Sequence, residues 1–137
     1  MKLTSIEIRI LGSLIEKELT TPDYYPLTLN SLRIACNQKS NRTPVMDLSE
    51  EDILHVLEDL RAKKLVIFSS GASQRVTKYK HNCYEYFEIN KPETTLLAIL
   101  LLRGEQTADE LRTRSHRMFD FETIEAVSEV LSGLENR

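Results

Sequence analysis

The chain has 137 residues, of which 41% are hydrophobic and 28% are charged, the composition of a globular protein rather than a low-complexity one. A formal net charge of −3 argues against a protein that coats nucleic acid nonspecifically, because such proteins are strongly basic. The longest apolar run, 96–102, is too short to cross a bilayer, and the first residues lack the apolar core of a signal peptide. We therefore expect a cytoplasmic protein with no membrane partner.

Three helices are predicted in the first half of the chain. Thr4 and Glu7 have the spacing of a capping box, and apolar residues three and four positions apart then predict a helix to about residue 19. A Pro-containing loop at 21–26 separates it from a short helix at 28–37. A Ser followed by three acids at 49–52 predicts the start of a third helix that continues to about residue 63.

A strand, a turn and a second strand are predicted next, at 65–68, 70–73 and 75–81, and residues 82–90 extend the sheet or form a connector. The stretch 61–81 contains no acid but several cations: Arg61, Lys63, Lys64, Arg75, Lys78 and Lys80. The order helix, helix, helix, strand, turn, strand is that of a winged helix-turn-helix. Such folds most often present one helix and one hairpin to DNA.

The last third of the chain repeats the three-helix pattern. A shift of 86 positions superposes Ile10, Leu11, Leu14 and Ile15 on Leu96, Leu97, Leu100 and Leu101. The sequence ends where the second strand pair would begin. We predict a mainly α fold with a small antiparallel β wing (α+β), a tandem winged helix-turn-helix whose second copy is truncated before its wing. The first domain is expected at 1–90 and the second, incomplete domain at 91–137, leaning on the first domain or on another chain.

The sequence has no pattern typical of an enzyme. It lacks a Gly-rich phosphate loop, Gly-x-Ser-x-Gly, His-Glu-x-x-His and Cys-x-x-Cys. His55 is expected on a helix surface, and the acids at 50–52 are explained by the positive end of a helix. Cys36 and Cys83 are expected to be free thiols. We therefore predict no enzymatic activity, no cofactor and no metal site.

Two segments are candidates for contact with double-stranded DNA: the basic strand–turn–strand and the polar loop 37–42. Asn, Gln, Lys and Arg are the residue types that hydrogen-bond bases and phosphates. The candidate residues are Asn37, Gln38, Lys39, Asn41, Arg42, Lys63, Lys64, Arg75, Lys78 and Lys80. Each segment also has a simpler interpretation, since basic strands are often solvated edges and Asn side chains often stabilise turns.

A protein partner is the alternative to DNA. The acids that begin the third helix would repel phosphates, and residues 92–137 hold 5 Lys and Arg against 9 Asp and Glu. A positive face that joins the hairpin to Lys39 and Arg42 would support DNA. A hairpin paired with the acids of the third helix would favour an interaction adaptor. In either case we expect a homodimer.

Several long strings of the sequence closely resemble the YceH-like family of bacterial proteins of unknown function. The matching strings are Leu14–Asp23, Tyr25–Leu27, Ala35–Arg42, Pro44–Met46, Leu48–Glu50, Leu101–Gly104, Gln106–Thr107 and Glu110–Arg112. The resemblance covers essentially the whole chain and implies two winged-helix domains in each subunit, the second with its own strands and wing. It implies no established activity, ligand or catalytic residue, and its link to DNA is an analogy from fold.

Overall fold

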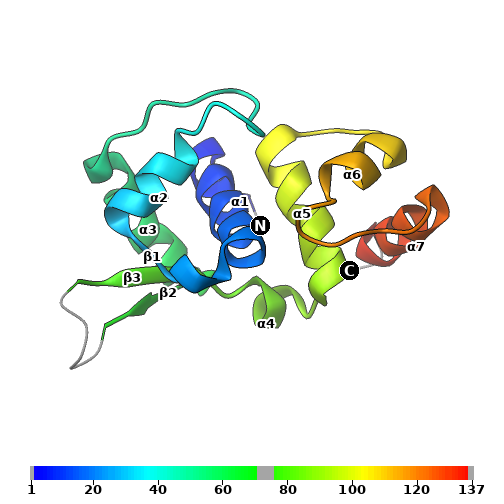
Figure 1. Cartoon of the computed structure of the whole chain (residues 1–137). Coiled ribbons are helices and arrows are strands. Elements are labelled where there is room, and N and C mark those ends of the chain that lie inside the picture. Colours follow the sequence, from blue (N-terminus) through cyan, green and yellow to red (C-terminus); the bar gives the residue numbers. More distant parts are fainter. Residues whose placement is uncertain (1, 71–75, 136–137) are drawn as a thin grey trace.

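The structure is a computed structural model that describes residues 2–70 and 76–135 (Figure 1). Arg75 and most of the predicted turn lie outside the described residues, as do residues 136 and 137. Among the described residues, no helix combines the length and the apolar character needed to cross a bilayer.

The N-terminal part of the chain contains three α-helices: α1 (Ser5–Thr20), α2 (Leu29–Cys36) and α3 (Glu50–Ala62). A short 3₁₀ turn, η1 (Pro22–Tyr24), follows α1. The predicted capping box is confirmed, because Glu7 N–H donates to Thr4 Oγ1 at 3.2 Å and Thr4 N–H donates to Glu7 Oε1 at 2.8 Å. Ser49 caps α3 by accepting from Asp52 N–H at 3.0 Å, as the sequence predicts.

A three-stranded antiparallel sheet packs beside these helices, with the strand order β1–β3–β2. It consists of β1 (Leu27–Thr28), β2 (Val66–Ser69) and β3 (Lys78–His81). Leu27 lies opposite Tyr79, and Val66 lies opposite His81. The two predicted strands are present, whereas β1 falls at the edge of a segment predicted as loop and helix. In Figure 1, β2 and β3 extend away from α6 and α7.

The second part of the chain contains helices and no strand among its described residues. Residues 82–90 do not extend the sheet but form the alternative, a connector, which contains a short helix, α4 (Cys83–Phe87). The helices α5 (Lys91–Arg103), α6 (Ala108–Arg114) and α7 (Ile124–Glu135) follow. A capping box of Asn90 and Glu93 starts α5. Gly104 ends α5 with a φ of 82°, a left-handed backbone conformation that favours glycine.

Helices α1 and α5 pack closely at Gly12. A Cβ atom at this position would lie 2.8 Å from Leu102 Cγ, so only a glycine lets the two helices approach this far. The face of α5 turned toward α1 is buried through Ala98, Ile99 and Leu102. Of the positions that the repeat aligns with the core of α1, Leu96 is buried, whereas Leu97, Leu100 and Leu101 are half-buried.

The fold class predicted from the sequence is confirmed. The chain is mostly helical with a small antiparallel sheet, an α+β fold consistent with a winged-helix-like architecture. The order α1, β1, α2, α3, β2, β3 places the predicted hairpin directly after the third helix. The division into domains at 1–90 and 91–137 stays a prediction.

Candidate nucleic-acid interface

Strand β3 separates its apolar and basic side chains by simple alternation. Tyr79 and His81 are buried, Lys80 is exposed and Lys78 is half-buried. The Tyr79 ring meets Phe68 of β2 edge-on, with ring centroids 4.9 Å apart. Because successive side chains of a strand point to opposite faces, the two lysines share the outer face of the sheet.

His81 fixes β3 to α1. Its Nε2 lies 2.7 Å from Glu18 Oε1, and its Nδ1 accepts from Cys83 N–H at 3.0 Å. Since the accepting Nδ1 carries no hydrogen, Nε2 is the donor to Glu18. The backbone N–H of His81 donates to the Tyr25 hydroxyl at 2.8 Å. These bonds hold the inner face of β3, so its lysines are presented from a fixed strand.

The two lysines that follow α3 have different surroundings. Lys63 Nζ lies 2.6 Å from Glu7 Oε2, and the Glu7 side chain is almost fully buried. Burial raises the pKa of Glu7, but the hydrogen bonds from Lys63 and Thr4 outweigh it and hold that pKa below its ordinary value. Lys64 is exposed at a φ of 67°. Lys63 therefore forms an ion pair with Glu7 within the protein, and Lys64 faces solvent.

Lys64, Lys78 and Lys80 lie within ion-pair distance of no carboxylate among the described side chains. The acids of α3 therefore do not pair with the lysines of β3. Arg61, by contrast, pairs with Glu58 at 2.7 Å and lies over the Phe68 ring at 4.2 Å from its centroid.

The outward face of α3 is acidic. Its exposed residues are Glu50, Glu51, Asp52, Leu54, His55, Glu58, Asp59, Arg61 and Ala62. In a helix-turn-helix protein this helix would enter the major groove, where phosphates flank it on both sides. Five acids against one arginine would be repelled there, as the first turn of the helix already suggests from sequence.

The Asn37 and Gln38 side chains of the polar loop 37–42 are hydrogen-bonded to other parts of the protein. Asn37 exchanges two hydrogen bonds with the backbone of Leu48, at 2.8 and 2.7 Å. Gln38 accepts from Lys17 Nζ at 3.0 Å and donates to Ser40. Lys39 is exposed. Asn37 therefore ties the loop to Leu48, eleven positions away, rather than stabilising a local turn, and Gln38 ties it to α1.

Arg42 lies in the interior, which differs from its predicted place on a DNA-binding surface. Its guanidinium donates to both carboxylate oxygens of Glu16, at 2.7 and 3.0 Å, and its Nε donates to Ala35 O at 3.0 Å. The two side chains are 0% and 1% exposed. Arg42 is therefore unavailable to phosphates, and no positive surface runs from the hairpin to it.

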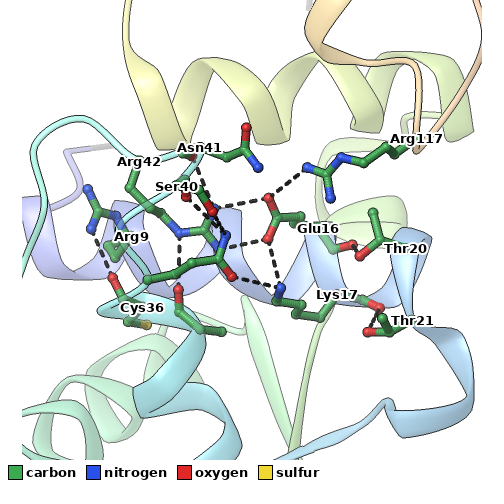
Figure 2. A network of polar contacts seen from close by, with 12 residues as sticks. Arg9, Glu16, Lys17, Thr20, Thr21, Cys36, Ser40, Asn41, Arg42 and Arg117 are labelled. Carbon is green, nitrogen blue, oxygen red and sulfur yellow. Dashed lines mark hydrogen bonds and ion pairs between the residues drawn. The ribbon is translucent and has the colours of Figure 1, made fainter.

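A second basic cluster adjoins this buried pair. Figure 2 shows the Glu16 carboxylate between the guanidinium groups of Arg42 and Arg117. Asn41, in a left-handed conformation at a φ of 57°, accepts from Arg103 Nη2 at 2.8 Å. We call the small pocket formed here the seam pocket. Its lining residues are Glu16, Asn41, Ile99, Leu102, Arg103, Arg114, Arg117 and Met118.

The arginines of the seam pocket were not predicted as site residues. Arg103, Arg114 and Arg117 lie in a part of the sequence with a net negative charge, about 60 to 100 residues from Asn41 and Glu16. No local pattern joins them, since the packing of α5 on α1 and of α6 on α5 brings them together. Among the described residues, no group of three or more His, Cys, Asp or Glu side chains could hold a metal ion.

An apolar groove of about 610 Å³ lies between α4, α5 and α7. Its lining residues are Tyr86, Phe87, Glu88, Ile89, Leu97, Leu100, Leu131 and Leu134. Leu97 and Leu100 are two of the half-buried positions that the repeat aligns with the core of α1. Part of the groove is therefore lined by positions of α5 that the repeat aligns with Leu11 and Leu14, which are buried in α1.

Comparisons with known proteins identify relatives over the whole chain. A family model described as "Protein of unknown function, DUF480" matches residues 3–137. A "UPF0502 protein" of Geotalea daltonii is 53% identical over 135 residues, 98% of this chain and 62% of the relative. One of Shewanella frigidimarina is 49% identical over 141 residues, 100% of this chain and 65% of the relative. The chain thus spans less than two thirds of the length of these relatives.

Proposed function

Starting from the fact that the chain belongs to the DUF480 family of proteins of unknown function, we propose that it is a non-enzymatic DNA-binding module that contacts duplex DNA through β3 and Lys64. Membership in a bacterial family of unknown function, predicted from the sequence motifs, is confirmed. The names of the relatives give no activity, so the proposal depends on the geometry of this chain.

The observation that carries the proposal is the arrangement of Lys78 and Lys80. Both lie on the outer face of a strand whose inner face is fixed by Tyr79 and His81. Neither meets a carboxylate among the described side chains, so their charge is available to an anionic partner. Phosphates are the commonest targets of such lysines in protein–DNA interfaces.

The proposed mode of binding uses the wing and keeps α3 away from the phosphates. Lysines on a two-stranded projection can follow the backbone or enter the minor groove without a helix in the major groove. Arg75, predicted as part of the same surface, lies outside the described residues. Because few cations contribute, we expect weak binding with a modest salt dependence.

A salt titration tests the proposal. Fluorescence anisotropy with a labelled duplex should show binding at low salt that weakens as salt increases. Lys78→Ala with Lys80→Ala should reduce the slope of log K against log salt by roughly one unit for each lost phosphate contact. Lys91→Ala, an exposed lysine at the start of α5, is the matched control and should leave the slope unchanged. Absence of binding to any duplex at low salt would overturn the proposal.

A protein-binding adaptor is the second candidate, favoured by the acidic outward face of α3. Leu54 is 40% exposed among these acids, which suits a basic partner with an apolar anchor. Charge reversal at Glu51 and Asp59 to Lys distinguishes the two candidates. It should increase duplex affinity if DNA is the partner, and it should abolish capture of a protein from nuclease-treated lysate if the adaptor interpretation is right.

We also propose a cytoplasmic homodimer, which would place two wings along one duplex. The apolar groove between α4, α5 and α7 supports a self-association surface, because exposed apolar surface of this kind marks interfaces. Light scattering should give the mass of two chains, and Leu131→Lys should give the mass of one. A monomeric parent protein would remove this part of the proposal.

A further inference from the structure

We propose that the seam pocket binds a phosphate group through the guanidinium groups of Arg103, Arg114 and Arg117. This site is separate from the lysines of β3 and does not depend on the DNA-binding proposal. The shared chemistry of its ligands is a phosphate oxyanion, whether from inorganic phosphate, a nucleotide or a DNA backbone.

The first argument is an imbalance of charge. Arg103, Arg114 and Arg117 line the pocket with one carboxylate, Glu16. Arg42 binds this carboxylate as well, and Arg114 has a second carboxylate, Glu110, at 3.5 Å outside the lining. Both oxygens of Glu16 are already bound by Arg42 at hydrogen-bond distances. Arg117 reaches the same carboxylate only at 3.5 Å. Arg103 donates to the neutral amide oxygen of Asn41 at 2.8 Å, and Arg114 donates to that of Gln106 at 2.6 Å.

Helix ends do not remove this imbalance. Arg103 and Arg114 are the last residues of α5 and α6, and a helix C-terminus offers about half a negative charge to nearby cations. Two such ends and two carboxylates leave an excess of roughly one positive charge over the four arginines. Burial is the main cause that lowers the pKa of Arg103, and the charges of Arg114, Arg117 and Arg42 lower it further, against the opposite effect of Glu16.

The second argument is the shape of the site. The enclosed space is about 10 Å³, which is room for a water molecule, and its apolar residues are Ile99, Leu102 and Met118. The Arg117 side chain is 51% exposed, so the pocket opens to solvent beside it. A phosphate group would lie at this mouth and receive forked N–H groups from several sides. Arginine forks match phosphate oxygens well, and several forks satisfy a tetrahedral dianion better than a planar carboxylate.

Titration with inorganic phosphate at constant ionic strength tests the inference. The midpoint of thermal unfolding should rise saturably with phosphate for the parent protein, because a ligand that binds only the folded state stabilises it. Arg117→Ala and Arg114→Gln should weaken the apparent affinity at least tenfold. Arg117 is half-exposed and makes only a long contact to Glu16, so its variant is expected to fold. Arg33→Ala, an arginine of α2 outside the pocket, is the control and should leave the phosphate effect unchanged.

A second arm distinguishes the sources of phosphate. If the DNA backbone uses the site, phosphate at constant ionic strength should compete with the labelled duplex, and Arg117→Ala should weaken duplex binding where Lys91→Ala does not. If neither added phosphate nor Arg117→Ala changes duplex binding, while the saturable thermal shift is present, the ligand is a free phosphate or nucleotide. Two results would overturn the inference. The first is that phosphate gives no saturable thermal shift and Arg117→Ala leaves duplex binding unchanged. The second is that the thermal shift of the Arg117→Ala and Arg114→Gln variants equals that of the parent protein. Loss of duplex binding in Lys78→Ala with Lys80→Ala concerns β3 alone, so the two proposals fail separately.

Discussion

Arg42 and Glu16 form a buried ion pair in which Nη2 and Oε1 are 2.7 Å apart and neither side chain is more than 1% exposed. The pair joins the loop after α2 to the last turns of α1 (Figure 2). Arg9, also buried, donates to the carbonyl oxygens of Cys36 and Pro44 and holds the same loop from the other side. The loop that sequence suggests as a candidate for DNA contact is therefore anchored on the interior of the protein.

Removal of one partner should be far more costly than removal of a surface pair. Glu16→Ala leaves the Arg42 charge buried without a counter-charge, and we expect a loss of about 3–5 kcal/mol in the free energy of unfolding. Glu58→Ala breaks the exposed pair with Arg61 and should cost no more than about 1 kcal/mol. Urea denaturation measures both. Equal effects of the two substitutions would show that the Arg42–Glu16 pair is not desolvated.

Stability should decrease in acid because of Glu7 and Glu16. Burial raises the pKa of both carboxyls, but hydrogen bonds and charges from Lys63 at Glu7 and Arg42 at Glu16 outweigh it and lower the pKa below 4.5. A carboxyl whose pKa is lower in the folded than in the unfolded protein stabilises the folded state. This stabilisation is complete above the pKa of the unfolded state and is lost as pH falls through the pKa of the folded state. The free energy of unfolding should therefore fall progressively below about pH 5.

The pH dependence can be assigned with two variants. Glu7→Gln and Glu16→Gln each remove one of the titrating groups, so each should make the unfolding free energy less steep between about pH 5 and pH 3. The measurement is a series of urea transitions across that range. A slope identical to that of the parent protein in both variants would assign the acid sensitivity to other carboxyls.

Local patterns predict the parts of the fold that depend on neighbouring residues. The capping box of Thr4 and Glu7 is one case, and the strand that holds Lys78 and Lys80 is another, because each needs only residues within a few positions. Strand β1 could not be predicted in this way. It has two residues, and it forms only because Leu27 and Thr28 pair with β3, about 50 positions away.

The candidate site was predictable only in part for the same reason. Sequence places Lys78 and Lys80 on a strand, and the structure has that strand. It also offers Arg42 as a DNA-contacting residue, although Glu16, 26 positions earlier, holds it inside. Lys63 is likewise taken by Glu7, 56 positions away. In both cases the side chain is held by a carboxylate on another element, and a single sequence does not show which elements pack together.

Gly12 should tolerate no larger residue. A Cβ atom there would lie 2.8 Å from Leu102 Cγ and 3.2 Å from Leu101 Cβ, and Leu102 is only 2% exposed, so it has little room to move. Gly12→Ala should destabilise the protein by about 1–3 kcal/mol even though alanine is the better helix former. Gly133→Ala, where the nearest atom is at 3.7 Å, is the matched control and should be neutral or stabilising. The midpoint of thermal unfolding, measured for both variants, tests this prediction. A Gly12→Ala variant more stable than the parent protein would show that α5 does not approach α1 this closely.

The two cysteines should resist thiol reagents until the protein unfolds. Burial raises the pKa of Cys36 to about 11 and that of Cys83 to about 12. At pH 8 a thiol of pKa about 11 holds roughly a hundredfold less thiolate than one of pKa 9.0, the ordinary value here, and the thiolate is the reactive form. Both side chains are fully buried, so steric exclusion slows the reaction further. Labelling with an aromatic disulfide reagent should therefore be at least about a hundredfold slower in buffer than in denaturant. Rapid labelling of one thiol in buffer would show that its helix opens locally, α2 for Cys36 or α4 for Cys83. The Cys36→Ser and Cys83→Ser variants identify the thiol that reacts.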